Sequence, residues 1–151
     1  MKEILPLPSS SAWEDSVHTR VLVIDDDVEM TELLKIVLEP NEFEVFSANS
    51  GVEGIESIRK NKWDVIILDL LMPEMDGWQV CEAIREFSQV PILVLSAVSK
   101  PGMVSRALDA GADDYLIKPM PSSVLVAHIK NLTRRARAEK EAAKSKLNIC
   151  L

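Results

Sequence analysis

The chain has 151 residues, 47% of them hydrophobic and 27% charged, which is enough to bury the core of one domain. Its net charge is −7, and residues 20–132 carry ten basic against nineteen acidic side chains, which argues against direct nucleic-acid binding. No apolar run of about 18 residues and no signal-peptide core is present, so we expect no membrane association and a cytoplasmic location.

Residues 1–19 carry no apolar period and contain two prolines and the run Ser9-Ser10-Ser11. This composition predicts a flexible N-terminal arm. Trp13 is the arm's one aromatic residue, and it either docks on the domain or is incidental.

From residue 20 onward, short apolar segments alternate with amphipathic ones. The apolar segments predict five strands, at 21–24, 44–48, 65–68, 92–95 and 115–117. Helical spacing of apolar residues predicts helices over 28–39, 51–60, 78–87 and 103–110, and a last helix that begins at 124.

Strands that are apolar throughout are typical of a parallel sheet buried on both faces. Five such strands, each followed by a helix, predict an α/β domain over 20–132 with a doubly wound, flavodoxin-like (βα)5 sheet. Right-handed crossovers favour the strand order 2-1-3-4-5. In such folds the functional site lies at the carboxyl ends of the strands.

Polar residues stand at four of these strand ends: Asp25, Asp26 and Asp27 after the first, Asp69 after the third, Ser96 after the fourth and Lys118 after the fifth. Carboxylates brought together repel one another unless a cation neutralises them, and Mg²⁺ suits oxygen ligands. A carboxylate can also attack phosphorus to form an aspartyl phosphate. For Asp27 alone, a solvated loop position is an equally good interpretation.

These segments resemble the receiver domain of two-component response regulators, from about Arg20 to Leu132. The resemblance rests on the order and spacing of Asp25-Asp26-Asp27, Asp69, Met72-Pro73, Asp76-Gly77, Ser96-Ala97, Gly111-Ala112-Asp113-Asp114-Tyr115 and Lys118-Pro119.

The resemblance implies a role for each matching residue. Asp69 would be the phosphoacceptor, Asp26 a direct ligand of Mg²⁺, Asp25 a ligand acting through water, and Leu71 a ligand through its backbone carbonyl. Gly77 is expected to give the turn after Asp69 its backbone freedom.

Three further roles follow from the same resemblance. Ser96 would be the switch hydroxyl, Lys118 the family's lysine at the phosphoryl group, and Tyr115 the switch aromatic. The alternative for Tyr115 is a half-buried packing residue. Leu71 and Val98 stand where rapidly dephosphorylating receivers carry polar side chains that orient water, so we expect slow loss of phosphate here.

The partners implied are a sensor histidine kinase or phosphotransfer protein, and an output partner that the sequence does not identify. The chain would be no enzyme beyond its own phosphorylation and dephosphorylation. Many receivers of transcription factors carry a charge pair in the last helix where Val124 and His128 stand here, so we expect at most a weak, phosphorylation-dependent homodimer. A haloacid-dehalogenase phosphatase would need an acid at position 71, which is Leu.

Residues 133–151 carry six basic and two acidic side chains and are rich in helix formers, which predicts a charged helical extension. The seam of Leu125, Ile129, Leu132 and Ala136 is broken by Glu139, so a solvated helix is favoured over a dimeric coiled coil. The 19 residues after Leu132 are too few for a winged helix. A stand-alone module is therefore favoured over the receiver portion of a DNA-binding transcriptional regulator.

Overall fold

The computed structural model describes residues 18–149, with side chains through Leu147. Trp13 and the predicted arm up to residue 17 lie outside the described residues. The strands are β1 (Thr19–Ile24), β2 (Phe43–Ala48), β3 (Val65–Leu68), β4 (Ile92–Ser96) and β5 (Asp114–Ile117). The helices are α2 (Val28–Leu38), α3 (Gly51–Lys60), α4 (Gly77–Arg85), α5 (Pro101–Asp109) and α6 (Ser122–Ile149), with a 3-10 turn η1 at Glu39–Asn41.

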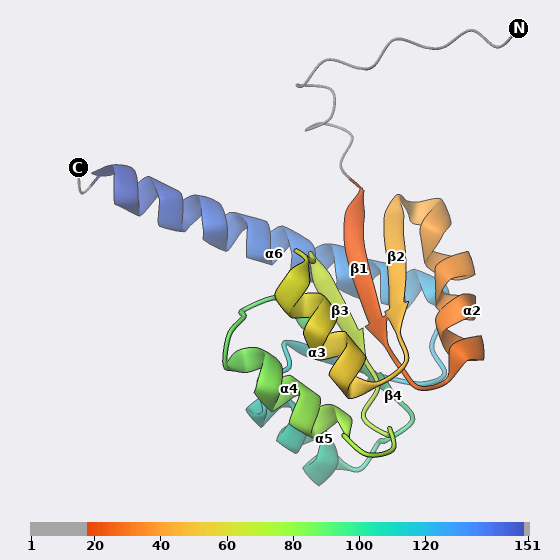
Figure 1. The fold of residues 1–151 in the computed structure, drawn as a ribbon. Helices are drawn as coiled ribbons and strands as arrows, with labels where there is room; N and C mark the ends of the chain where they lie inside the picture. Colours follow the sequence, from red (N-terminus) through yellow and green to blue (C-terminus); the bar gives the residue numbers. More distant parts are fainter. Residues whose placement is uncertain (1–17, 150–151) are drawn as a thin grey trace, which may run out of the picture.

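The five strands form one parallel sheet in the order β2-β1-β3-β4-β5, as predicted. Figure 1 labels β1 to β4. β1 lies between β2 and β3, and Val23 is paired with Ser47 on one side and Ile67 on the other. Chain order and spatial order therefore differ at β1, and this reversal brings the ends of β1 and β3 together at the sheet's carboxyl edge.

Two apolar layers cover the sheet. Alternate residues of β1 point to opposite faces, so Leu22 packs with α3, α4 and α5, whereas Val21 packs with α2 and α6. This period of two divides the core between the faces of the sheet.

Full burial of the strands is confirmed for the three central ones, β1 from Val21 onward, β3 and β4. For the two outer strands the interpretation was wrong. β2 alternates between buried and exposed residues, with Phe46 37% exposed, and Ile117 in β5 is 45% exposed. An outer strand has a neighbour on one side only, so less of its surface is covered.

Helix α6 is the longest element, with 28 residues. Leu125, Ile129 and Leu132 are buried against the sheet, so the apolar seam seen in the sequence packs on the domain itself. From Arg134 to Leu147 its side chains are exposed, apart from half-buried Ala136. Figure 1 shows this part running well past the sheet. Within residues 18–149, no helix is both long and apolar enough to cross a bilayer.

Candidate functional site

Three carboxylates meet at the carboxyl edge of the sheet. Asp25 and Asp26 directly follow β1, and Asp69 directly follows β3, and each offers an oxygen within 4.8 Å of the other two. The predicted cluster is therefore brought together by the neighbouring positions of β1 and β3. Asp25 is only 3% exposed, which makes its charge costly unless it is compensated.

Both carboxylate oxygens of Asp25 already have protein partners. One accepts a hydrogen bond from the backbone amide of Asp27 (3.0 Å), and the other lies 3.3 Å from the ammonium group of Lys118. Asp26 is exposed, and among residues 18–149 its carboxylate has no hydrogen-bond partner. Asp26 is therefore freer than Asp25 to give an oxygen to a ligand.

Asp69 is half-buried beside these groups. Burial raises the pKa of its carboxyl above the usual range, and the nearby charge of Asp25 raises it further. Lys118, the backbone amide of Leu71 and the hydroxyl of Ser96 act in the opposite direction. A divalent cation at this point would relieve the mutual repulsion of the carboxylates.

Asp27 does not belong to this cluster. Its side chain accepts a hydrogen bond from the amide of Met30 at 3.3 Å and so forms the N-cap of α2. Asp27 was expected to be either a metal ligand or a solvated loop residue, and neither interpretation included its role as the N-cap of α2. The signal was available, because an aspartate directly before a helical pattern is a common N-cap.

Ser96 and Tyr115 are linked through the backbone of one residue. The Ser96 hydroxyl, which is fully buried, accepts a hydrogen bond from the amide of Val98 at 3.3 Å. The Tyr115 hydroxyl donates a hydrogen bond to the carbonyl of the same Val98. Sequence reasoning considered only the side chain of Val98, and no sequence pattern reports these two backbone contacts.

Gly77 is needed for close approach, so the prediction that it supplies backbone freedom was wrong. The residue with a positive φ in this loop is Glu74, at 66°, whereas the φ of Gly77 is not positive. A Cβ on Gly77 would lie 2.4 Å from the carbonyl oxygen of Asp69 and 2.6 Å from the Cα of Leu70. The absence of a side chain at Gly77 therefore lets α4 begin directly against the backbone of Asp69.

The donor set fits Mg²⁺. Three carboxylates supply hard oxygen ligands, which Mg²⁺ prefers, and no sulfur or imidazole lies in the cluster. The acidic cluster of Asp25, Asp26 and Asp69 is typical of the Mg²⁺ site of receiver domains.

Residues 21–130 match the family described as the response regulator receiver domain. The chain therefore belongs to the receiver domains of two-component response regulators, which are signalling modules rather than conventional enzymes. Receiver domains interact with histidine kinases.

Individual relatives agree with this membership. The transcriptional regulatory protein SrrA of Staphylococcus aureus is 38% identical over 122 residues, which are 81% of this chain and 51% of that protein. The chain thus spans about half the length of the curated relatives it matches.

Solved structures show the same fold. A two-component response regulator from Clostridium difficile has a TM-score of 0.76 at 34% identity and covers 79% of this chain and 98% of its own. The chemotaxis protein CheY4 of Vibrio cholerae has a TM-score of 0.73 at 29% identity, with coverages of 77% and 99%.

Proposed function

We propose that this domain is a phosphorylation-dependent switch in which Asp69 accepts a phosphoryl group from a sensor histidine kinase or phosphotransfer protein. The observation that carries the proposal is the convergence of Asp69 with Asp25, Asp26 and Lys118 at one edge of the sheet. An oxygen of Asp69 attacks the phosphorus, and the bond from phosphorus to the donor breaks. Fixed charges that offset those of the phosphoryl oxygens account for most of the catalysis in such a transfer.

The hydrogen bonds and ion pairs of each residue indicate its role in binding Mg²⁺ and the phosphoryl group. Asp26, which has no partner among the described residues, would bind Mg²⁺ directly together with Asp69 and the carbonyl of Leu71. Asp25, whose oxygens are both engaged, would act through water and hold Lys118 in place. When bound, Mg²⁺ supplies positive charge that neutralises the phosphoryl oxygens. Lys118 supplies a second positive charge for the same oxygens.

The switch would run from Ser96 to Tyr115 through Val98. The Ser96 hydroxyl can donate its proton to a phosphoryl oxygen on Asp69, and its contact with the Val98 amide would carry the change into the loop after β4. Since Tyr115 is bound to the carbonyl of Val98, a shift of this loop changes the position of the tyrosine at the surface of β5. This gives the phosphorylated state a surface that a partner can distinguish.

The output would be binding to a partner protein in the cytoplasm, where response regulators typically work. The alternative is that this domain is the receiver portion of a DNA-binding transcriptional regulator. That alternative is supported by the resemblance to SrrA, of which the matched region is 51%. The length of the encoding reading frame distinguishes the two.

Substitution of Asp26 tests the site directly. Asp26→Ala is expected to reduce Mg²⁺-dependent phosphorylation by a small phosphodonor strongly, because a direct metal ligand is lost. Asp27→Ala is expected to leave phosphorylation close to wild type and to lower the free energy of unfolding by about 1 kcal/mol, because an N-cap is lost. Phosphorylation rates against Mg²⁺ concentration and urea unfolding curves measure the two effects. Equal loss of phosphorylation in both variants would contradict the assignment.

Self-association on phosphorylation is expected to be weak. Three charged residues at the face formed by α5, β5 and α6 are already engaged within the domain. Arg106 stacks on Trp78 at 4.8 Å, Asp113 pairs with Arg85 at 2.8 Å, and Asp114 is bonded to His128. Val124 adds an apolar side chain, 37% exposed, where a charge would be needed. We therefore expect sedimentation with beryllofluoride, a phosphoryl mimic, to show mainly monomer.

The matched variant restores the charge pair. Val124→Glu with His128→Lys should raise the dimer fraction in beryllofluoride and leave it unchanged without the mimic. A tight wild-type dimer through the charged face of α5 and α6 would refute the prediction.

A further inference from the structure

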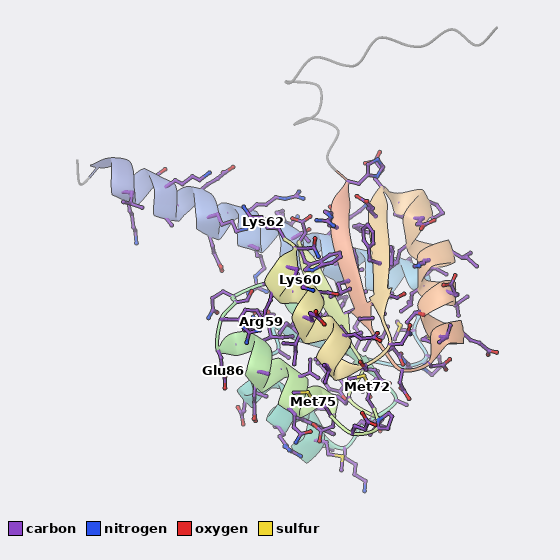
Figure 2. The ribbon with its side chains drawn as sticks, in the orientation of Figure 1. Arg59, Lys60, Lys62, Met72, Met75 and Glu86 are labelled. Atoms are coloured by element: carbon purple, nitrogen blue, oxygen red, sulfur yellow. The ribbon has the colours of Figure 1, made fainter. Side chains whose placement is uncertain are left out.

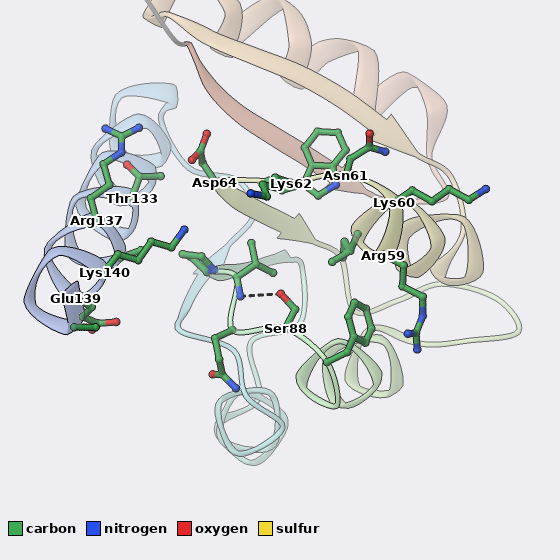
Figure 3. A pocket seen from close by; sticks show the side chains of 18 residues that line it. Arg59, Lys60, Asn61, Lys62, Asp64, Ser88, Thr133, Arg137, Glu139 and Lys140 are labelled. Carbon is green, nitrogen blue, oxygen red and sulfur yellow. Dashed lines mark hydrogen bonds between the residues drawn. The ribbon is translucent and has the colours of Figure 1, made fainter. Parts of the chain in front are cut away.

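A groove of about 890 Å³ lies at the end of the sheet opposite the carboxylate cluster. Its walls are the segment from α3 into β3, the segment from α4 into β4, and the side of α6 from Thr133 to Ala143 (Figure 3). Figure 2 shows Lys60 and Lys62, which line it, far from Met72 and Met75 in the loop that follows Asp69. The groove is therefore separate from the proposed phosphorylation site.

The groove combines an apolar floor with a basic rim. Trp63, Phe87 and Val90 line it together with five basic side chains and only two acidic ones. The basic residues are Arg59, Lys60, Lys62, Arg137 and Lys140. This excess of basic side chains contrasts with residues 20–132 as a whole, which contain nineteen acidic and ten basic side chains. The lining fits a short segment that carries both an apolar side chain and carboxylates.

Two of the rim lysines are available to a ligand. Lys60 is paired with Glu56 at 2.6 Å, and the guanidinium of Arg59 stacks on Phe87 at 4.0 Å. By contrast, Lys62 and Lys140 form no ion pair with any residue between 18 and 149. They stand on opposite walls of the groove, the first before β3 and the second on α6 (Figure 3).

The chain enters β1 at the rim of this groove. The hydroxyl of Thr19 lies 3.4 Å from the guanidinium of Arg137. The next residue, Arg20, stacks on Trp63 at 4.6 Å and donates a hydrogen bond to the carbonyl of Lys62 at 2.9 Å. Residues 19 and 20 thus touch lining residues on both walls.

Just before this entry point the sequence reads Trp13-Glu14-Asp15. Thr19 is six positions along the chain from Trp13, and an extended chain spans roughly 3.3 to 3.6 Å per residue, so Trp13 can reach about 20 Å from Thr19. A short tether also gives the segment a high effective concentration at the groove, on the order of millimolar for a flexible linker.

We propose that the groove is the docking site of this chain's own segment Trp13–Asp15. The indole of Trp13 packs on the apolar floor, and the carboxylates of Glu14 and Asp15 face Lys62 and Lys140. The docked segment joins the body of the domain to the exposed half of α6 and so restrains the direction of that helix. This restraint acts at the end of the sheet opposite the carboxylate cluster.

Fluorine NMR of the full chain labelled with fluorotryptophan tests the proposal. The chain has three tryptophans, and Trp13→Phe identifies the resonance of Trp13. In the wild type we expect this resonance to be shifted from that of a synthetic peptide of residues 1–17. Lys62→Glu with Lys140→Glu should move it to the free-peptide position. Combining these two changes with Glu14→Lys and Asp15→Lys should restore the wild-type shift.

The control is Arg135→Glu with Lys144→Glu, which makes the same change of charge on exposed positions of α6 outside the groove. It should leave the Trp13 resonance unchanged. A free-peptide shift in the wild type overturns the proposal, as does a shift that the groove variants do not alter. A shift that depends on protein concentration also overturns it, because the groove would then hold a segment of a second copy.

Discussion

Replacing Asp69 by asparagine is expected to abolish phosphorylation while the fold is retained. The amide is isosteric with the carboxylate but cannot act as the nucleophile, and no other carboxylate of the cluster combines its half-buried position with the neighbouring Ser96 and Lys118. The change also removes a negative charge from a group whose pKa is raised by burial and by the nearby charge of Asp25. Without Mg²⁺, the thermal stability of the variant should therefore equal or exceed that of the wild type.

The measurement is acid-labile phosphate after incubation with a phosphohistidine kinase or a small phosphodonor. Asp27→Asn is the matched control, because it makes the same chemical change outside the cluster and asparagine still caps a helix. The control should be labelled like the wild type. Full labelling of the Asp69 variant would show that the phosphoacceptor lies elsewhere.

The phosphorylated state is expected to be long-lived, and polar residues at two positions should shorten its lifetime. Hydrolysis needs a water molecule held in line with the phosphorus atom, and positioning is a large part of catalysis in phosphoryl transfer. In rapidly dephosphorylating receivers, polar side chains orient this water, and by the family resemblance Leu71 and Val98 occupy their two positions here. Leu71 is 57% exposed and Val98 is half-buried, and neither side chain can form a hydrogen bond.

Leu71→Asn with Val98→Glu is therefore expected to accelerate loss of phosphate roughly tenfold or more, since a misplaced reacting group can cost about 10²-fold. The decay of phosphate on purified protein measures this. Leu71→Ile with Val98→Ile keeps both positions apolar and should decay like the wild type.

Leu71→Asn alone tests the positioning of water with less disturbance of the fold, because this exposed position tolerates a polar residue better than the half-buried position of Val98 does. It should give part of the acceleration. A wild-type decay as fast as that of the double variant would show that side-chain positioning of water does not set the lifetime.

Most of the architecture follows from local sequence patterns. The central strands are apolar at every position because both of their faces are covered, and that pattern is visible without the structure. The order 2-1-3-4-5 then places the residues after β1 and β3 side by side, so the cluster of Asp25, Asp26 and Asp69 could be predicted. The outer strands β2 and β5 were predicted less well, because their one-sided burial depends on where they stand in the sheet.

The separate tasks of neighbouring residues were decided by tertiary contacts. Asp25, Asp26 and Asp27 are identical in type and adjacent in sequence. Only the positions of Lys118 and Met30 show that the first is held by the protein, the second is free among the described residues, and the third caps a helix.

The requirement for Gly77 and the basic groove were likewise not predictable from the sequence. The need for glycine at position 77 comes from the carbonyl of Asp69, eight residues earlier, and the groove unites α3, the segment between α4 and β4, and α6 from distant parts of the chain. Sequence patterns report periodicity and local backbone preference. Close approach and the sharing of charges between remote segments are set by how the layers pack, so only the tertiary structure determines them.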